Sequence, residues 1–337
     1  VQADVGSTIS VIASYTDDQG TDENVASTAT AAVTNVNDIP TGSVTIDNTS
    51  PAQGDTLTAS NTLADVDGLT GPISYQWQRG GVDIAGATGS TYTTVQADVG
   101  STITVVASYT DDQGTEENVA STATAAVTNV NDAPTGSVTI DNITPAQGDT
   151  LTASNTLADI DGLTGPISYQ WQRGGVDIAG ATGSTYTTVQ ADVGSTITVV
   201  ASYTDDQGTD ETVASTATSA VTNVNDAPTG LVTIDNMSPA QGDTLTASNT
   251  LADIDGLTGP ISYQWQRGGA DIAGATGSTY TTVQADVGST ITVVASYTDD
   301  QGTDENVAST ATAAVTNVND TPTGSVTIDN TSPAQGD

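Results

Sequence analysis

The sequence predicts an all-β protein, a tandem array of β-sandwich domains of about seven strands each. The segment VQADVGST begins at Val1 and returns at Val95, Val189 and Val283, so the chain repeats every 94 residues. This period is longer than the roughly 20–50 residues of a solenoid unit and matches the length of a whole small domain. Inside each period, short runs of alternating apolar and polar residues are separated by turn residues at intervals of about ten residues.

The repeats divide most naturally at the Pro-containing segments VNDIPTG, VNDAPTG and VNDTPTG. Three complete repeats then span residues 39–132, 133–226 and 227–320, and the first two differ at 7 of 94 positions. We expect residues 1–38 to be the C-terminal part of an earlier repeat and residues 321–337 the N-terminal part of a further one, in an excerpt from a longer array. The linkers are short and contain Pro rather than Gly/Ser runs, which predicts stiff joints.

Each repeat shows β patterning throughout. In the first complete repeat, residues 44–48 and 56–63 are the first two expected strands, and residues 119–130 are expected to form a long closing strand of Thr, Ala and Val. Between these, Ile73, Tyr75 and Trp77 share one face at period two, as do Ile103, Val105, Ala107 and Tyr109. About seven strands in 94 residues is typical of an immunoglobulin-like sandwich, and we interpret Trp77, on the third strand, as a core residue.

The composition excludes several classes of function. The chain has 41 acidic and 3 basic side chains, a formal net charge of −38, and no His, Cys, Lys or Phe. Nucleic acids and anionic membranes are bound through Lys and Arg, so neither is an expected partner. No apolar run approaches the roughly 18 residues of a membrane-spanning helix. Without His, Lys or Cys, and with no base beside any Ser or Asp, catalysis is not expected.

Of the 41 acidic residues, 5 are Glu and the other 36 are Asp. Solubility alone could use either residue, whereas an excess of Asp indicates tight turns or binding of a hard cation. A generally acidic surface, as in proteins adapted to high salt, is a third interpretation.

The expected topology brings many of these acidic residues to one end of each domain. In a sandwich of alternating strands, the N-terminus, the loop between the second and third strands and the loop between the sixth and seventh strands share one end. In the repeat 133–226 these segments are the linker, ADIDGLTG and TDDQGTDE. They contain Asn131, Asp132, Asp159, Asp161, Asp205, Asp206, Asp210 and Glu211.

We expect calcium at or near this joint. Asp55 and Asp98, from the far end of the preceding repeat, are expected to contribute further carboxylates to the same joint. Two unit charges about 4 Å apart repel by roughly 4 kcal/mol at an effective dielectric constant of 20, so a divalent cation is needed among them. Calcium accepts roughly 6–8 oxygen ligands in flexible geometry, whereas transition metals favour the His and Cys that this chain lacks. The candidate ligands are Asp38, Asp65, Asp67, Asp111, Asp112, Asn131, Asp132, Asp159, Asp161, Asp205, Asp206, Asp226, Asp253, Asp255, Asp299, Asp300 and Asp320. The alternative is that these loops are tight turns with solvated charges.

Three other features have simpler interpretations. Arg79, Arg173 and Arg267 occur once per repeat in WQRGG, and we expect each to form a local ion pair or hydrogen bond rather than to bind an anion or a sugar. The N-x-S/T sequences that begin at Asn48 and its equivalents are each followed by Pro, so we interpret the Asn residues as turn residues rather than glycan sites. Exposed aromatic residues are few, and Tyr92 and its equivalents are the main candidates for a sugar-binding surface.

Three sequence features resemble the tandem immunoglobulin-like or cadherin-like extender repeats of giant bacterial surface adhesins of the RTX type, which are exported by type I secretion. They are the Pro-containing linkers and the segments SYQWQRGGVDIAGATGSTYT and ADVGSTITVVASYTDDQGT. The resemblance covers essentially the whole chain. It implies a secreted protein at the bacterial cell surface, whose repeats project a terminal adhesion domain and are stiffened by calcium. In the linker, Asn131, Asp132 and Pro134 match the cadherin pattern DxNDNxP, whereas Asn129 and Ala133 depart from it.

Three functions are compatible with these observations. The first is a structural spacer of a calcium-dependent adhesin, in which neighbouring repeats of the same chain are the partners. The second is a binding module whose repeated faces contact glycans or identical arrays. The third is a subunit of an extracellular filament or matrix fibre, built by contacts with identical chains.

Overall fold

The computed structural model describes residues 1–329, 331–332 and 334–335. The described residues contain 23 strands and four short 3₁₀ helices. None of these helices has the length and hydrophobicity needed to cross a membrane. The described chain separates into two compact units, of which the first consists of Val1–Ser137, Thr156–Ile167 and Ser202–Val213 and the second of the other described residues. The repeat boundaries at the Pro-containing linkers remain a prediction.

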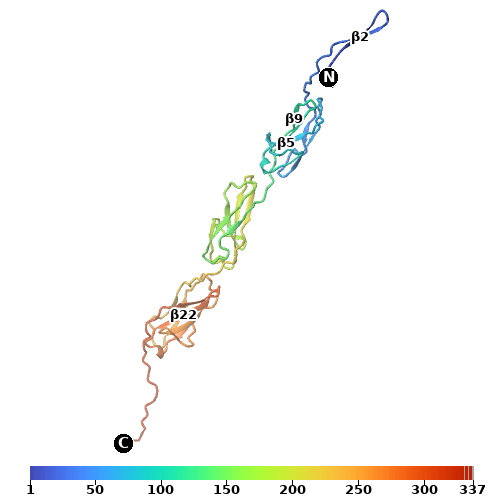
Figure 1. The fold of residues 1–337 in the computed structure, drawn as a ribbon. Helices are drawn as coiled ribbons and strands as arrows, with labels where there is room; N and C mark the ends of the chain where they lie inside the picture. Colours follow the sequence, from blue (N-terminus) through green and yellow to red (C-terminus); the bar gives the residue numbers. More distant parts are fainter. Residues whose placement is uncertain (330, 333, 336–337) are drawn as a thin grey trace. The chain divides into compact units, whose positions relative to one another are not determined.

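Each complete repeat contains seven strands, which confirms the predicted fold class (Figure 1). In the first, β3, β4 and β7 form a three-stranded antiparallel sheet, and β6, β5, β8 and β9 form a four-stranded antiparallel sheet in that order. The strands are β3 (Val44–Ile46), β4 (Thr56–Asn61), β5 (Ser74–Arg79), β6 (Val82–Asp83), β7 (Thr91–Thr93), β8 (Ile103–Thr110) and β9 (Glu116–Ala120).

The same order of elements returns in the other repeats. The second repeat contains β10 (Val138–Ile140), β11 (Thr150–Asn155), β12 (Ser168–Arg173), β13 (Val176–Asp177), β14 (Thr185–Thr187), β15 (Ile197–Thr204) and β16 (Asp210–Ala214). The third contains β17 (Val232–Ile234), β18 (Thr244–Asn249), β19 (Ser262–Arg267), β20 (Ala270–Asp271), β21 (Thr279–Thr281), β22 (Ile291–Thr298) and β23 (Asp304–Ala308). Before them, β1 (Ile12–Thr16) and β2 (Asp22–Ala26) form a hairpin equivalent to the last two strands of a repeat. The 3₁₀ helices are η1 (Gln2–Asp4), η2 (Gln96–Asp98), η3 (Gln190–Asp192) and η4 (Gln284–Asp286).

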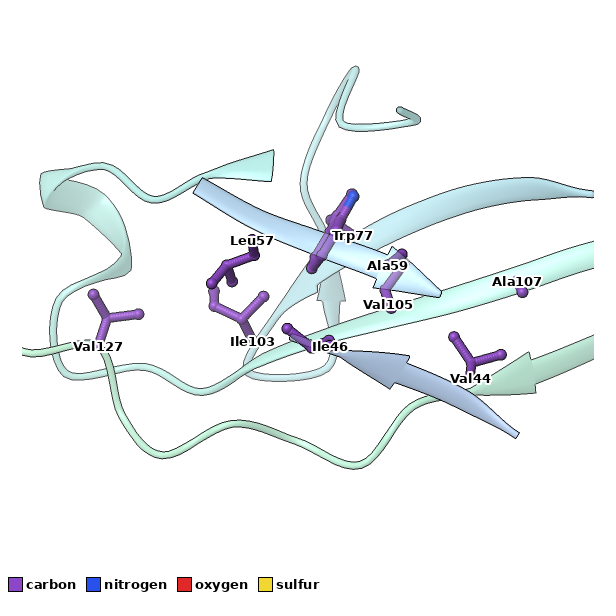
Figure 2. Packing of buried hydrophobic residues seen from close by; sticks show 9 residues of the cluster. All are labelled: Val44, Ile46, Leu57, Ala59, Trp77, Ile103, Val105, Ala107 and Val127. Carbon is purple, nitrogen blue, oxygen red and sulfur yellow. The ribbon is translucent and has the colours of Figure 1, made fainter. Parts of the chain in front are cut away.

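The core of the first complete repeat lies between its two sheets. The predicted period-two pattern is confirmed in β8, because Ile103, Val105, Ala107 and Tyr109 are buried while the residues between them are half-buried. Trp77 is fully buried, and its Nε1 donates to the carbonyl of Gly89 at 2.9 Å, which confirms its interpretation as a core residue. Figure 2 shows the nine core side chains, Val44, Ile46, Leu57, Ala59, Trp77, Ile103, Val105, Ala107 and Val127.

The predicted closing strand over residues 119–130 is wrong. Strand β9 ends at Ala120, and residues 127 and 128 then form only isolated parallel bridges. The ladder stops because the buried hydroxyls of Ser121 and Thr124 accept hydrogen bonds from two backbone N–H groups of β8, at 3.1 and 3.0 Å. Side-chain oxygens thereby replace carbonyls of a continuing strand.

The first two strands of this repeat end slightly earlier than predicted. β3 ends at Ile46 and β4 at Asn61. Asn48 follows β3, and its Oδ1 accepts the N–H of Ser50 at 3.0 Å in an Asx turn. This geometry confirms Asn48 as a turn residue.

Candidate metal centre

Two acidic loops meet at one end of each repeat, as the topology predicts. In the first complete repeat, the loop between β4 and β5 carries Asp67-Gly68, and the loop between β8 and β9 carries Asp112. The N–H and hydroxyl of Thr70 both donate to Asp112 Oδ1, at 3.2 and 2.7 Å. Gly68 has φ +100°, and a Cβ there would lie 2.3 Å from Asp112 Oδ2. Glycine is therefore required for the two loops to approach this closely.

The preceding linker donates two hydrogen bonds to the same loops. The backbone N–H of Asp38 donates to Asp67 Oδ2 at 2.6 Å, and Asn37 Nδ2 donates to Glu117 Oε1 at 2.7 Å. The pattern recurs at the next two linkers. The equivalent distances are 2.6 Å for Asp132 to Asp161, 2.7 Å for Asn131 to Glu211, 2.6 Å for Asp226 to Asp255 and 2.9 Å for Asn225 to Glu305.

Each of these ends contains two buried carboxylate oxygens that have no hydrogen-bond donor. In the first complete repeat they are Asp67 Oδ1 and Asp111 Oδ2, on side chains of residues that are 2% and 4% exposed. A buried acceptor without a partner is unfavourable, and a charged one strongly so. The equivalent atoms are Asp161 Oδ1, Asp205 Oδ2, Asp255 Oδ1 and Asp299 Oδ2. All three complete repeats thus present the same pair of oxygens.

Backbone donors lower the pKa of two of these carboxylates, Asp205 and Asp299. In the second complete repeat, Asp205 Oδ1 accepts the backbone N–H groups of Thr209 and Gln207 at 2.8 and 2.9 Å. These backbone hydrogen bonds, that of Thr209 above all, lower the pKa of Asp205, and the corresponding bonds lower the pKa of Asp299. The second oxygen of Asp205 and that of Asp299 have no hydrogen-bond donor.

A buried tyrosine orients a further carboxylate at each end. The hydroxyl of Tyr109 donates to Asp65 Oδ2 at 2.6 Å, while Asp65 Oδ1 accepts the N–H of Asp67 at 2.9 Å. Burial, and then the hydrogen bond to Asp65, raise the pKa of the Tyr109 phenol, so it remains a neutral donor. The equivalent pairs are Tyr203 with Asp159 and Tyr297 with Asp253.

The donor set fits a hard divalent cation. In the third complete repeat, Asp253, Asp299 and Glu305 each offer one carboxylate oxygen, and the three oxygens lie within 4.8 Å of one another. All three ligand atoms are oxygens, which calcium prefers, whereas transition metals favour nitrogen and sulfur ligands. The arrangement can bind a cation.

The candidate ligands do not all point into this cluster. Asp253 and Asp299 lie close together with Glu305, and Asp67 and Asp111 each keep one oxygen without a donor. The Oδ1 of Asp112, in contrast, accepts from Thr70 and holds the loops together. Asp206 and Asp300 are the equivalents of Asp112, and they accept hydrogen bonds from Thr164 and Thr258 in the same way. The linker residues Asp38, Asp132 and Asp226 contribute their backbone N–H groups, and Asp320 Oδ2 accepts from Gln241 Nε2 at 3.1 Å.

The sequence did not single out Glu305, or its equivalent Glu117, as a candidate ligand. Both lie on the last strand of their repeats, outside the Asp-rich turn. The signal that could have identified them is the alternation of that strand. Glu117 is half-buried two residues before the half-buried Val119, so the two share a face.

The expected contribution of Asp55 and Asp98 to the joint is wrong, because donors of their own repeat surround them. Asp55 Oδ2 accepts from Asn48 Nδ2 and the N–H of Ala52, at 3.0 and 2.9 Å. Asp98 is fully buried and is the third residue of η2, where its Oδ2 accepts the N–H of Val95 at 2.8 Å.

The local role expected for Arg79 is confirmed by its ion pair with Asp98, at 2.6 Å between Nε and Oδ1. Tyr92 also donates to Asp98, at 2.7 Å, and its ring lies 5.8 Å from that of Trp77. Burial, and then the bond to Asp98, raise the pKa of Tyr92 to about 12. Tyr92 thus packs on the core rather than forming an exposed sugar-binding platform.

Comparison with known proteins gives similarity only to solved structures, since no family model and no curated protein matches the chain. One similar structure is described as a Ca²⁺-stabilized adhesin that helps an Antarctic bacterium reach out and bind ice. It is 18% identical over 92% of this chain and 81% of that chain, with a TM-score of 0.29.

A second similar structure is a tetra-tandem repeat in the extending region of a large adhesion protein. It is 20% identical over 92% of this chain and 83% of that chain, with a TM-score of 0.31. A third is the D1–D4 ectodomain fragment of ICAM-5, which is 16% identical over 81% of this chain and 76% of that chain, with a TM-score of 0.33. Repeats of bacterial adhesins, which the sequence motifs resemble, are therefore among the solved structures similar to this chain.

Proposed function

We propose that the chain is a non-catalytic spacer of a bacterial cell-surface adhesin, and that the acidic end of each repeat binds calcium. The observation that carries this proposal is the pair of buried, unpartnered carboxylate oxygens in each complete repeat. The two oxygens belong to Asp67 and Asp111 in the first of them, beside a linker that donates to the same loops. The adhesin repeats among the similar structures support the spacer role.

In the repeat 133–226 the ion would be held by Asp159, Asp205 and Glu211, the equivalents of the carboxylate cluster in the third repeat. The unpartnered oxygen of Asp161 would be a further ligand. When bound, calcium supplies positive charge that the chain does not have at this end, since all three basic residues pair with Asp98, Asp192 and Asp286. The protein's own part is to hold the oxygens in place. Tyr203 orients Asp159, the backbone of the TDDQG turn fixes one oxygen of Asp205, and the linker N–H of Asp132 fixes one oxygen of Asp161.

The site has a mechanical consequence because the linker contributes to it. Binding would favour the conformation in which residues 131–132 donate to the loops of the following repeat. Calcium would therefore limit the movement of that joint and stabilise the repeat whose loops form the site. A spacer at the cell surface needs this stiffness to project an adhesive domain.

Small-angle scattering of the whole chain, with calcium and then with excess chelator at constant ionic strength, tests the proposal. We expect a long particle that becomes shorter and more flexible on chelation, and a melting temperature that falls with it. An unchanged profile would mean that the Asp clusters are turns with solvated charge, and that stiffness comes from the Pro-containing linkers or from assembly with other chains.

Substitutions locate the site. Asp161→Asn removes one unpartnered oxygen and should abolish calcium uptake at one of the three sites, as measured by isothermal titration calorimetry. Asp177→Asn is the matched control, because it removes the same charge from the exposed strand β13. Equal calcium uptake by the two variants would show that Asp161 is not a ligand. Sedimentation velocity with calcium separates the single-chain spacer from a laterally assembled fibre.

A further inference from the structure

The linker residue Asp132 makes two hydrogen bonds in opposite directions along the chain. Its side-chain Oδ2 accepts from Gln53 Nε2 at 2.7 Å, and its backbone N–H donates to Asp161 Oδ2 at 2.6 Å. Gln53 lies in the turn before β4 of the first complete repeat, and Asp161 lies in the acidic cluster of the next repeat. A single residue thus connects two consecutive repeats.

Gln53 contacts the linker at two points. Besides the bond to Asp132, its Oε1 accepts the backbone N–H of Val130 at 3.4 Å. Its own backbone N–H donates to the carbonyl of Thr128 at 2.9 Å, which fixes the turn beside the linker. The carboxamide therefore bonds the residues on either side of Asn131. Asn131 in turn donates to Glu211 in the acidic cluster, at 2.7 Å.

The arrangement recurs at the next linker. Gln147 Nε2 donates to Asp226 Oδ2 at 2.8 Å, and its Oε1 accepts the N–H of Val224 at 3.3 Å. The N–H of Asp226 donates to Asp255 Oδ2 at 2.6 Å. In the third repeat, Gln241 also donates to the linker residue Asp320, at 3.1 Å. We name these Gln–Asp pairs, Gln53 with Asp132, Gln147 with Asp226 and Gln241 with Asp320, the linker latches.

We propose that Gln53 and Gln147 are positioning residues for the cation site of the following repeat, and this inference rests on the calcium site of the proposed function. The latch acts on the linker and touches neither the ion nor its carboxylate ligands. It holds residues 130–132 in the conformation in which Asn131 and the N–H of Asp132 reach the cluster. Calcium affinity in one repeat is therefore set in part by a turn of the repeat before it.

The expected size of this coupling follows from chain entropy. Without the latch, part of the linker must be ordered when the ion binds, and ordering the backbone of one residue changes an equilibrium constant by about fivefold to thirtyfold. Gln53→Ala should therefore weaken calcium binding by about fivefold to thirtyfold at one site and leave the other two unchanged. Gln147→Ala should do the same at the site that contains Asp255.

The chain contains a matched control. Gln241→Ala removes the same kind of bond to a linker Asp, but no complete repeat follows Asp320 within these 337 residues. It should therefore affect no site, while it removes the one side-chain bond that Gln241 makes to its linker. Calcium titration against a chromophoric chelator, with the full-length chain, gives the affinities of the three variants.

A second measurement is independent of calcium. In the chelated protein, amide hydrogen exchange of a peptide covering residues 125–137 should be faster in Gln53→Ala than in the wild type. Mass spectrometry separates this peptide from its counterpart in the next repeat, because Ala125 and Ser137 are replaced there by Ser219 and Leu231. The counterpart peptide should exchange at the wild-type rate.

The outcomes separate this inference from the proposed function. If the wild type binds calcium and Gln53→Ala matches Gln241→Ala in affinity and in linker exchange, the latch is only a contact within its own repeat and the inference is overturned. If the wild type binds no calcium, the proposed function fails and no site remains for Gln53 to position. Faster linker exchange together with one weakened site supports the inference.

Discussion

Substitution of the buried carboxylate Asp98 by Asn tests the most heavily hydrogen-bonded group of the first complete repeat. Three donors meet its two oxygens. Arg79 Nε bonds Oδ1 at 2.6 Å, and the Tyr92 hydroxyl and the Val95 N–H bond Oδ2 at 2.7 and 2.8 Å. Asn has the same shape but presents one oxygen and one NH₂ group. Whichever way its amide turns, the NH₂ group faces a donor.

The loss can be estimated from these contacts. A hydrogen bond to a charged group contributes about 1.5–3 kcal/mol, and removal of one member of a buried ion pair costs roughly 3–5 kcal/mol. The Arg79 side chain is 33% exposed and is partly rehydrated when its partner is lost, so the lower end applies. We expect Asp98→Asn to reduce the free energy of unfolding of its repeat by about 3 kcal/mol. For a domain of this size that lowers the melting temperature by about 12–24 °C.

Differential scanning calorimetry of the whole chain measures this effect. About one third of the unfolding enthalpy should move to the lower temperature, since Asp192 and Asp286 keep the same contacts in the other two repeats. Asp83→Asn on the exposed strand β6 is the control and should leave the profile unchanged. If Asp98→Asn and Asp83→Asn melt together, the buried carboxylate contributes nothing to stability and the reasoning is refuted.

Backbone donation by Thr58 lowers the pKa of Asp47 from 3.8, so its stabilising contribution is present above pH 3.8 and is lost as the pH falls through the lower folded value. Urea midpoints of the wild type and Asp47→Asn should differ at about pH 5 and converge as the pH falls below 3.8. Burial raises the pKa of Tyr92 and Tyr186 from 10.0 to about 12, so their contribution is lost as the pH rises from 10 to 12. Circular dichroism should show unfolding in that window, and a fold unchanged above pH 12 would contradict it. Gly68→Ala should destabilise its repeat by roughly 1–3 kcal/mol in thermal unfolding, since its φ is +100°. Gly71→Ala in the same loop is the control, because the nearest atom to its added Cβ lies 3.8 Å away.

The sequence was sufficient to predict the sandwich because its core follows simple periodicity. The alternation in β8 and the position of Trp77 on β5 predict which side chains lie between the sheets. The end of β9 was not predictable in this way, since Ser121 and Thr124 look like ordinary strand residues. Their hydroxyls replace the carbonyls of a strand only because they face backbone N–H groups of β8, and this is a tertiary contact.

In the candidate site, too, some residues are predictable from the sequence and others depend on tertiary contacts. Asp67 and Asp111 lie on loops whose meeting follows from strand order alone, so the sequence points to them. The roles of Asp112, Asp132 and Asp98 depend on which donor each carboxylate meets, namely Thr70, Gln53 and Arg79. Counting acidic residues near a joint cannot separate a ligand from a carboxylate that already has a donor.

The two ends of a repeat treat negative charge differently, and this asymmetry favours a metal over a merely salt-tolerant surface. At one end, Asp98 is neutralised by Arg79 and by neutral donors of its own repeat. At the other end, Asp67 and Asp111 are equally buried, yet each keeps one oxygen without a donor, and no basic residue remains to pair with them. Salt screens exposed charges, but it does not supply the lone pairs of a buried oxygen with a partner. A cation that enters the site would do both, so the position of the unpartnered oxygens, rather than the total charge, marks where the proposed calcium ion would bind.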